Sequence, residues 1–203
     1  MSIGEMIKIW CNERKWRKQN QHNDTHIKSV FPLDKISVGK GTYGPINVLW
    51  MSKNGAITIG NSCSIGPEVK FLVGGAHLYK RISTFPFQSK IYHEKTRVNH
   101  ENIIIIEDDV WIGYEVLIMS GVTIGKGSVV GARSIVTKDI PPYSVFVGNK
   151  VIKQRFDSSI IEKIKGIDFS QINHSVGDEY QDFCQTEIGL ENVDDIVSKF
   201  IKG

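Results

Sequence analysis

A histidine follows a pair of glycines in the run Gly74-Gly75-Ala76-His77, and this is the setting in the chain best suited to acid–base chemistry. Glycine reaches backbone angles that are closed to other residues, so a Gly-Gly pair can present the next side chain at a chosen point. Neutral imidazole, with an unperturbed pKa of about 6.5, is the natural general base near neutral pH. None of the other five histidines has an equally specific setting. His77 is therefore the candidate catalytic base.

The segment that carries His77 interrupts a strict six-residue repeat. A period of six fits neither a helix, which repeats every 3.6 residues, nor an ordinary strand, which repeats every 2. It fits a chain that runs straight, turns a corner at a small or permissive residue such as glycine, and repeats. Three hexads make a triangular coil, and such repeats predict an all-β fold, a parallel β-helix. The repeat is carried by Ile106, Ile112, Ile118, Ile124, Val130 and Val136, with an earlier run at Ile59-Gly60, Ile65-Gly66 and Phe71.

Residues 72 to 105 break the period and separate the two runs of hexads. A break inside a solenoid is usually a loop thrown out from one corner, and loops of this length are disproportionately functional. The chain is therefore expected to divide into an N-terminal helical cap at residues 1–27, a β-helix at residues 28–150 with a protruding loop at 72–105, and a C-terminal helical tail at residues 151–203.

The N-terminal segment is expected to form an amphipathic helix at residues 3 to 19. One face is apolar and the remainder is basic, with Ile3, Met6, Ile7 and Trp10 set against Lys8, Arg14, Lys15, Arg17 and Lys18. A basic amphipathic helix can lie on a membrane surface. A cap over the first coil is the preferred interpretation, because the ends of a solenoid must be shielded. Two further helices are expected in the tail, at 157–165 and 190–201.

The composition argues against several classes of protein. The net charge of +3 is too small to indicate a nucleic-acid partner. Cys11, Cys63 and Cys184 are odd in number and widely spaced, which argues against a disulfide framework or a zinc cluster. No apolar signal core is present at the N-terminus, and no apolar run approaches membrane-spanning length. A cytoplasmic protein without a metal or a membrane span is therefore expected.

Taken as a set, these motifs resemble the hexapeptide-repeat acyltransferases. The resemblance rests on the hexads, on the Gly-Gly-Ala-His loop followed by Ser-Thr-Phe-Pro-Phe at 83–87, and on Glu-Asp-Asp-Val-Trp-Ile-Gly at 107–113. It covers residues 28 to 156 and is strongest toward the branch of xenobiotic acetyltransferases and surface-polysaccharide O-acetyltransferases. The family fold implies a left-handed β-helix, an exception to the usual right-handed crossover. Family members are homotrimers that hold acetyl-CoA between neighbouring prisms, so the resemblance implies the same assembly, cofactor and intersubunit active site here.

The resemblance also assigns roles to individual residues. His77 would deprotonate the acceptor hydroxyl as it attacks the thioester carbon of acetyl-CoA. A lysine beside the cofactor can neutralise one of its phosphates. The cofactor contacts correspond to corner residues and to the Thr-Lys pair after the last hexad, namely Gly113, Tyr114, Ala132, Thr137 and Lys138. A small residue at Gly113 or Ala132 is equally expected of any coil corner.

One departure from the family pattern concerns a further cofactor contact. The family usually continues Gly-Asn-Pro-Ala-Lys-Val-Ile-Lys, whereas this chain reads Gly-Asn-Lys-Val-Ile-Lys from Gly148 to Lys153. The loop is therefore shorter than in the family. Lys153 is assigned to the cofactor, although Lys150 and Lys153 are equally expected as solvated surface charges.

Aromatic side chains are candidates for the acceptor site, because their faces stack on sugar rings and on flat antibiotics alike. The candidates are Tyr43, Tyr79, Phe85 and Trp111, with Phe87 beside them. Phe85 and Phe87 are equally expected to pin the loop around Pro86. Trp111 is expected to point outward.

The sequence does not define the acceptor. A hydroxyl of a sugar or surface-polysaccharide precursor is the first choice, because the segments around 31–50 and 74–87 are similar to polysaccharide-modifying members. An antibiotic is the alternative. A γ-type carbonic anhydrase would need three histidines on zinc, and no histidine lies between Glu101 and Asn173. A non-catalytic scaffold would have no reason to combine the Gly-Gly-Ala-His loop with the Thr-Lys run.

Overall fold

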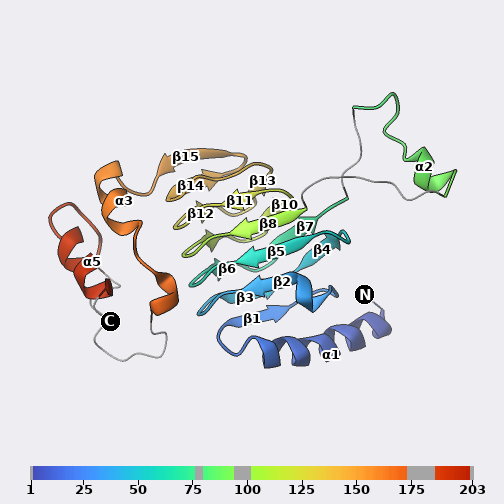
Figure 1. The fold of residues 1–203 in the computed structure, drawn as a ribbon, viewed down its shortest axis with the longest axis horizontal. Coiled ribbons are helices and arrows are strands. Elements are labelled where there is room, and N and C mark those ends of the chain that lie inside the picture. The colour runs from blue at the N-terminus through green and yellow to red at the C-terminus, as the bar shows by residue number, and fades with distance from the viewer. Residues whose placement is uncertain (1, 76–79, 94–101, 173–185, 202–203) are drawn as a thin grey trace.

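The computed structural model describes residues 2–75, 80–93, 102–172 and 186–201. Its body is a stack of β coils, with a helix beneath the first coil, a loop thrown out on one side and helices on the other (Figure 1). Three sheets form the stack, and neighbouring strands of a sheet come from successive coils. All pairs of named strands are parallel except β14–β15. The expected body of mostly parallel strands with few helices is confirmed.

The three sheets are named here A, B and C. Sheet A contains β1 (Asp24–Ile27), β3 (Tyr43–Ile46), β6 (Ser64–Ile65), β9 (Trp111–Ile112), β12 (Val129–Val130), β14 (Ser144–Val147) and β15 (Lys150–Gln154). Sheet B contains β2 (Ile36–Val38), β5 (Ala56–Ile59), β8 (Ile103–Ile106) and β11 (Thr123–Ile124). Sheet C contains β4 (Val48–Met51), β7 (Lys70–Val73), β10 (Leu117–Met119) and β13 (Ile135–Val136). The chain visits B, A and C in turn, which defines a B–A edge, an A–C edge and a C–B edge.

The repeating isoleucines and valines fill the interior of the stack. The six residues of the main repeat, from Ile106 to Val136, are each at most 1% exposed. Like residues of successive coils lie side by side in the registers Ile65↔Ile112 and Ile118↔Val136. Full burial of such a side chain is worth roughly 1.5–3 kcal/mol, so the hexads stabilise the coil as well as shape it.

The glycine after a buried isoleucine is required for its size rather than for its backbone angles. A Cβ on Gly60 would meet the carboxylate of Asp108 and lie 2.7 Å from the Asp108 nitrogen in the next coil. Gly60 is not among the positive-φ residues, and several corner positions with positive φ are held by larger residues: Ser62, Glu68, Asp109, Glu115, Arg133 and Tyr143. The expectation of a small or permissive residue at this corner is confirmed, and at Gly60 it is the small size that the fold requires. The close stacking of coils excludes a side chain at its position.

Helix α1 (Ile3–Gln19) closes the first coil, as expected of a cap. Its first turn has a capping box, in which the Glu5 carboxylate accepts the Ser2 N–H at 2.7 Å. Trp16 is fully buried against the first coil and meets the ring of Phe31 edge-on at 5.9 Å. Strand β1 pairs with β3, so the coil already begins inside the segment 1–27 that the sequence assigns to the cap.

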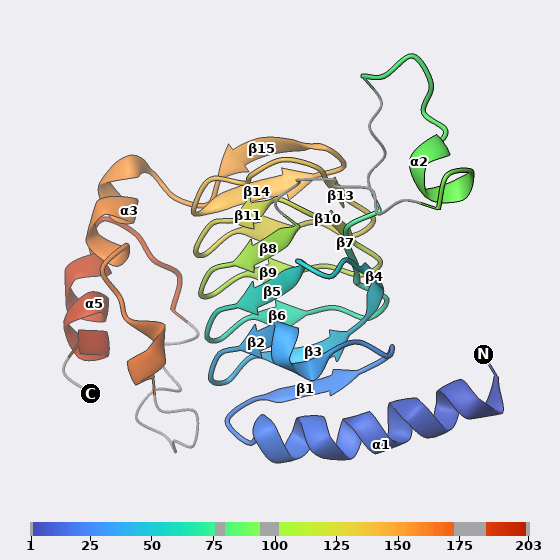
Figure 2. The ribbon, with the colours of Figure 1, turned by 45° about the vertical axis from the view of Figure 1, so that its right-hand side comes forward.

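The C-terminal helices cover the B–A edge and form a second small core (Figure 2). They are α3 (Ser158–Ile164) and α5 (Val193–Ile201), with the short turn η2 (Phe169–Gln171) between them. The Lys126 ammonium fastens them to the coil by donating to the backbone carbonyls of Lys165, at 3.0 Å, and Ile167. The two helices expected in the tail are confirmed within one to three residues. In the described ranges, no helix has both the length and the apolarity needed to cross a bilayer.

Candidate active site

The protruding loop leaves the stack at the C–B edge, directly after β7 (Figure 2). Its root is Gly74-Gly75, and both glycines have positive φ, +125° and +79°. Other residues adopt such angles only with strain, so the unusual backbone predicted from the Gly-Gly pair is confirmed. His77, the candidate base, and Tyr79, an acceptor candidate, lie outside the described residues, and both assignments remain predictions.

Thr137 and Lys138 lie at the same edge as the loop root. They follow β13, which is two strands from β7 in the order β13-β10-β7-β4. At about 4.8 Å per strand, they sit roughly 10 Å along the stack from the point where the loop emerges. Both side chains are exposed, and Lys138 forms no ion pair with a described residue. Lys138 is therefore a cation available to a ligand that runs along this edge.

Gly113, Tyr114 and Ala132 come together at a different edge, A–C. A Cβ on Gly113 would lie 2.7 Å from the Ala132 nitrogen, so the two corners are stacked directly. The Arg133 N–H donates to the Tyr114 carbonyl at 2.8 Å, and the Arg133 and Glu115 side chains pair at 2.9 Å beside it. Sheet C separates this edge from Lys138 by five residues, or roughly 16 Å. One protomer therefore presents its cofactor candidates on two edges, not in one groove.

The corners of the A–C edge have free donors, whereas two corner N–H groups of the B–A edge are bound by side chains of an adjacent coil. At the B–A edge, side chains of adjacent coils accept the corner N–H groups: Asp108 accepts from Asn61 at 2.6 Å, and Glu107 accepts from Lys126 at 2.7 Å. At the A–C edge, the N–H groups of Tyr114 and Ala132 have no acceptor among the described residues. Backbone donors without a partner are uncommon unless water or a ligand receives them. These two amides belong to exposed residues and are therefore available to water or to a ligand.

The run Glu107-Asp108-Asp109 has a structural role that the sequence analysis did not assign. Glu107 and Asp108 accept corner N–H groups, and Asp109 pairs with the Arg155 guanidinium at 3.2 Å. The run thus fastens three successive coils and the tail at the B–A edge. Three consecutive acidic residues at the corner that begins a hexad were the available sequence signal.

Two aromatic candidates share one column on the outer face of sheet A. Tyr43 pairs with Ser64, and Ser64 pairs with Trp111, so the two rings are two coils apart, or roughly 10 Å. Tyr43 is 53% exposed and Trp111 is 58% exposed, which confirms that Trp111 points outward. The third candidate, Phe85, meets Phe87 edge-on at 4.8 Å beside the short helix α2 (Phe87–Lys90). Both loop rings remain nearly half exposed and serve loop packing and ligand contact equally well.

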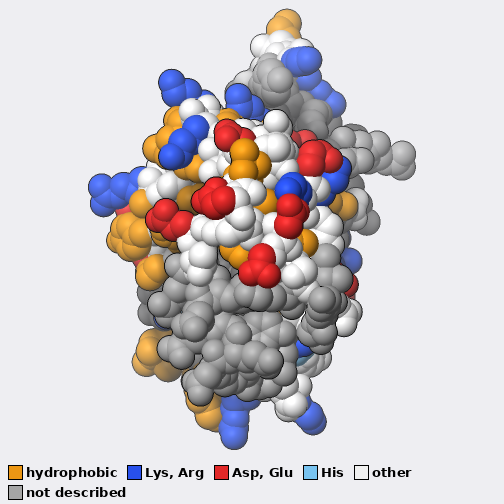
Figure 3. Space-filling view, turned by 90° about the vertical axis from the view of Figure 1, so that its left-hand side faces the viewer, with side chains coloured by type: hydrophobic (Ala, Val, Ile, Leu, Met, Phe, Trp, Pro, Cys, Tyr) orange, Lys and Arg blue, Asp and Glu red, His pale blue; other side chains and the backbone are white. Residues whose placement is uncertain are grey.

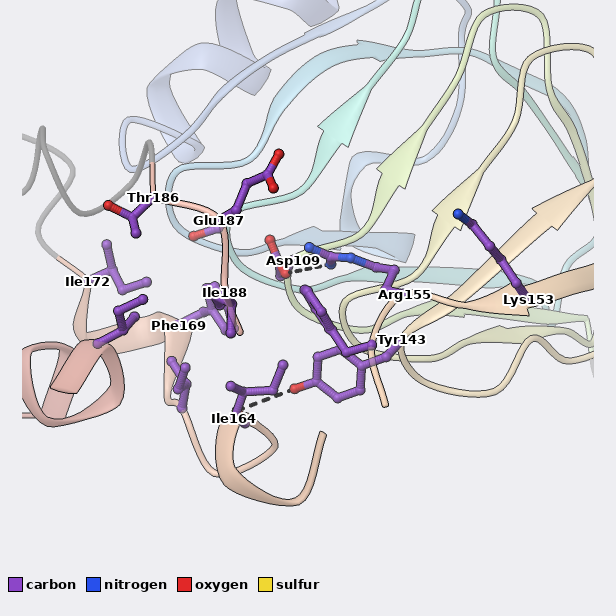
Figure 4. Close-up of a pocket in the computed structure, with 14 residues that line it drawn as sticks. Asp109, Tyr143, Lys153, Arg155, Ile164, Phe169, Ile172, Thr186, Glu187 and Ile188 are labelled. Carbon is purple, nitrogen blue, oxygen red and sulfur yellow. Dashed lines mark hydrogen bonds and ion pairs between the residues drawn. The ribbon is translucent and has the colours of Figure 1, made fainter. Parts of the chain in front are cut away.

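Lys153 lies apart from the other cofactor candidates. The shortened loop is a tight turn, in which Gly148 has φ +68° and the chain returns as the antiparallel strand β15. Lys153 pairs with Val145 on this strand and borders a hollow of about 850 Å³ under the C-terminal helices (Figure 4). The structure therefore does not bring Lys153 to Lys138 or to the A–C edge of its own protomer.

Asp109, Arg155 and Tyr143, three polar groups of this hollow, make bonds that stabilise the fold. Burial raises the pKa of the Asp109 carboxyl, and the neighbouring Arg155 guanidinium opposes that rise. Burial also raises the pKa of Tyr143 to about 12, and its hydroxyl donates to the Ile164 carbonyl at 3.3 Å (Figure 4). A tyrosine with so high a pKa does not suit a proton transfer near neutral pH. Among the described side chains, no three His, Cys, Asp or Glu residues cluster as metal ligands.

The chain is similar in sequence to known acetyltransferases. Residues 103–138 match the family model described as bacterial transferase hexapeptide (six repeats). A probable macrolide acetyltransferase of Lysinibacillus sphaericus is 34% identical over 155 residues, which are 72% of this chain and 84% of that protein. A chloramphenicol acetyltransferase of Agrobacterium fabrum is 40% identical over 114 residues, which are 52% of this chain and 54% of that protein. The match thus spans about half the length of that chloramphenicol acetyltransferase.

Solved structures of acetyltransferases are also similar to this chain. A hexapeptide-repeat acetyltransferase of Vibrio cholerae, solved with acetyl coenzyme A, superposes with a TM-score of 0.52 at 31% identity. The match covers 70% of this chain and 75% of that one. A galactoside acetyltransferase solved with coenzyme A gives a TM-score of 0.51 at 29% identity and covers 74% of this chain and 72% of that one. The chain belongs to the hexapeptide-repeat acetyltransferase family.

Proposed function

We propose that the protein is an acetyl-CoA-dependent O-acetyltransferase that acts on a hydroxyl of a sugar or surface-polysaccharide precursor. The observation that carries the proposal is the pair of unpartnered amides, Tyr114 and Ala132, on an exposed edge of stacked corners. The arm of coenzyme A carries amide carbonyls that such donors can bind. In this proposal the β-helix is left-handed, as in the family, and the division into cap, β-helix and tail is kept, with β1 and β15 counted in the β-helix.

The active site of this proposal lies between two protomers. The free amides and Lys138 occupy opposite edges of sheet C, so one extended cofactor reaches both only if the A–C edge of one copy meets the C–B edge of the next. The outer face of sheet C supports such packing, because it is apolar apart from Lys70, which lies in register with Leu117. Its outward side chains include Leu49, Leu72, Leu117, Met119 and Ile135, of which Leu49 and Ile135 are about half exposed. A homotrimer with sheet C facing the three-fold axis buries this face and joins the two edges.

A charge on sheet C is expected to break this assembly. Ile135→Glu would place a carboxylate in the apolar interface, and burying an unpaired charge is costly. Sedimentation velocity is expected to show a trimer for the parent and mostly monomer for Ile135→Glu at micromolar concentration. Ile152→Glu is the control, because Ile152 is 53% exposed on β15 of sheet A and should leave the trimer intact. A parent that sediments as a monomer contradicts the proposed site.

In the proposed reaction, His77 removes the proton of the acceptor hydroxyl while the oxygen attacks the thioester carbon. The tetrahedral intermediate then collapses as the C–S bond breaks, and coenzyme A leaves as the thiol with the proton that His77 had taken up. Tyr43 and Trp111, two coils apart on sheet A, offer flat faces for a sugar ring. The galactoside acetyltransferase among the similar structures supports a sugar acceptor. The macrolide and chloramphenicol acetyltransferases among the relatives support the alternative, an antibiotic acceptor.

Measuring thiol release from acetyl-CoA against a panel of acceptors tests the proposal. The panel includes hexoses, N-acetylhexosamines, sialic acid, short capsular oligosaccharides, chloramphenicol and a macrolide. Acceptor-dependent thiol release with a saccharide, and an ester on the product by mass spectrometry, is the expected result. Release only with an antibiotic would select the alternative. Absence of acetyl-CoA binding in calorimetry would contradict both and leave the non-catalytic scaffold.

Lys138 provides a test of the cofactor position. Lys138→Ala is expected to weaken acetyl-CoA binding by about 1–3 kcal/mol, the usual scale of a charge-assisted contact. The loss should shrink as salt rises, because the side chain is exposed. It should appear in KM for acetyl-CoA and scarcely in KM for the acceptor. Calorimetric titration of the parent and the variant measures the change.

Three further lysine variants complete the measurement. Lys35→Ala is the matched control, because Lys35 is an exposed lysine in the short turn η1 (Leu33–Lys35) and should bind acetyl-CoA as the parent does. Lys150→Ala and Lys153→Ala test whether the shortened loop has taken over the phosphate contact. Parental binding by Lys138→Ala, with weakened binding by either β15 variant, would show that the cofactor assignment at Lys138 is wrong.

A further inference from the structure

Helix α1 has two apolar faces, and only one of them is used by the fold. Trp16 is buried and Ile9 packs against the main core. The second face, called here the outer face of α1, comprises Ile3, Met6, Ile7 and Trp10, which are between 54% and 78% exposed. At about 100° per residue, Ile7 lies opposite Trp16 on the helix. The outer face therefore points away from the coil, where a solenoid cap is normally polar.

The net charge of the protein is concentrated in this helix. α1 carries five basic and two acidic residues, and the remaining twenty basic and twenty acidic residues of the chain balance. Both acidic side chains are bonded to backbone: Glu5 caps the helix, and Glu13 accepts the Ile27 N–H at 2.7 Å. Arg17 donates to two backbone carbonyls of the first coil. Apart from the exposed Glu5 at the start of the helix, the charge left to face solvent is positive.

The four remaining cations flank the outer face. They are Lys8, Arg14, Lys15 and Lys18, all exposed and without an ion pair among the described residues. Arg14 and Lys18 lie within about 20° of the direction opposite Trp16, beside Ile3 and Ile7. The Arg14 guanidinium also rests over the Trp10 ring, 4.8 Å from its centroid. In Figure 3, basic and hydrophobic side chains protrude at the lower end, where α1 lies, while acidic side chains gather over the C-terminal helices.

We propose that the outer face of α1 docks the protein on an anionic membrane surface. Exposed aliphatic side chains and a tryptophan enter the boundary between headgroups and acyl chains, and flanking lysines and arginines meet anionic headgroups. The alternative occupant is a second copy of the chain. A symmetric contact between two α1 helices would bring the same cations together, and like charges across an interface are unfavourable. Charge complementarity therefore favours the anionic lipid surface.

The proposal does not depend on the acetyltransferase activity. In the trimer proposed above, three copies of α1 would lie at the same end of the parallel stacks, provided that the three-fold axis follows the stack direction. Three weak contacts of one trimer with the same membrane give a higher overall affinity than a single contact, without any new interaction. A membrane-docked trimer would also hold its sites close to an acceptor that is assembled on a lipid.

Co-sedimentation with vesicles tests the proposal on the full-length protein. The protein is expected to bind phosphatidylcholine vesicles that contain about a third phosphatidylglycerol, and to bind pure phosphatidylcholine vesicles at least about tenfold more weakly. Ile7→Glu removes an apolar contact and adds a repelled charge, so it should lower the partition coefficient at least about tenfold. Leu190→Glu is the matched control, because Leu190 is 55% exposed outside α1 and should bind as the parent does.

Two results would overturn the proposal. Failure of the parent to bind anionic vesicles, or equal binding by Ile7→Glu and Leu190→Glu, would remove the membrane as the occupant. If Ile7→Glu instead lowers the sedimentation coefficient of the protein without lipid, the outer face of α1 belongs to an interface between copies. Acetyl transfer to a soluble acceptor is expected to be the same in Ile7→Glu and the parent, so a docking defect is distinguishable from failure of the proposed enzyme.

Discussion

Replacing His77 by alanine is expected to lower kcat by about 100-fold to 10,000-fold and to leave the affinity for acetyl-CoA nearly unchanged. A sugar hydroxyl is a poor nucleophile near neutral pH, so a base that removes its proton in the transition state lowers the barrier by several kcal/mol. The base contacts the acceptor, whereas the cofactor is proposed to bind the edges of sheet C. Stopped-flow or steady-state thiol release measures kcat, and calorimetry measures the dissociation constant of acetyl-CoA.

The control for His77 is His93→Ala. His93 follows helix α2 in the same protruding segment, is exposed and lacks the Gly-Gly setting, so its loss should change kcat less than twofold or so. For the parent, kcat/KM should rise with pH through the imidazole pKa, because only the neutral ring accepts a proton. The residual rate of His77→Ala should lack that rise. Near-parental turnover by His77→Ala would remove His77 from the mechanism.

The hexad repeat predicts the body of the fold because coil geometry is local. Each buried isoleucine or valine needs another six residues later, and the repeat from Ile106 to Val136 is buried without exception. Glycine was expected as a small or permissive residue, and the fold uses the permissive backbone at Gly74, where φ is positive, and the small size at Gly60. A single sequence shows that a corner excludes a side chain, but it does not separate crowding by the next coil from a demand on φ.

Strand β1 shows where the repeat fails as a signal. Asp24-Thr25-His26-Ile27 has no hexad pattern, yet it pairs along β3 and is covered by α1. A terminal coil stacks on another coil on one side only. Its other side packs against the cap, so its sequence need not follow the hexad pattern. The cap itself was predictable, since the helix at residues 3–19 follows from ordinary helical periodicity.

The candidate site was predictable by residue type but not by arrangement. The sequence places Gly113, Ala132 and Lys138 within one run of hexads, and only the coil topology shows that sheet C separates them. The position of Lys153 depends on the shortened loop. That loop forms a tight turn, after which β15 runs antiparallel to β14. The unpartnered amides of Tyr114 and Ala132 leave no mark in the sequence at all. Only the three-dimensional arrangement of the corners determines which backbone N–H groups lack an acceptor.

Replacing Trp16 by alanine is expected to lower the free energy of unfolding by about 3–5 kcal/mol, the usual cost of emptying a fully buried aromatic site. The Trp16 side chain closes the end of the coil stack: its ring packs on Phe31, and its Nε1–H donates to the Thr25 hydroxyl at 3.0 Å. Its loss opens the first coil, whose neighbours bury their residues only by stacking. Equilibrium urea unfolding, followed by circular dichroism, measures the change in midpoint and in slope.

Two matched variants separate packing from the hydrogen bond and from the loss of any tryptophan. Trp16→Phe keeps a ring in the site and loses the donor to Thr25, so it should cost less than the alanine variant, with about 1 kcal/mol from the hydrogen bond. Trp10→Ala removes a tryptophan of the same helix that is 60% exposed, and should shift stability by no more than about 0.5 kcal/mol. Equal midpoints for Trp16→Ala and Trp10→Ala would show that the first coil stands without its cap. In that case the role of α1 would rest on its outer face and not on closing the coil. Vesicle binding by Trp10→Ala, compared with vesicle binding by Trp16→Ala, would then decide whether the helix serves in membrane docking.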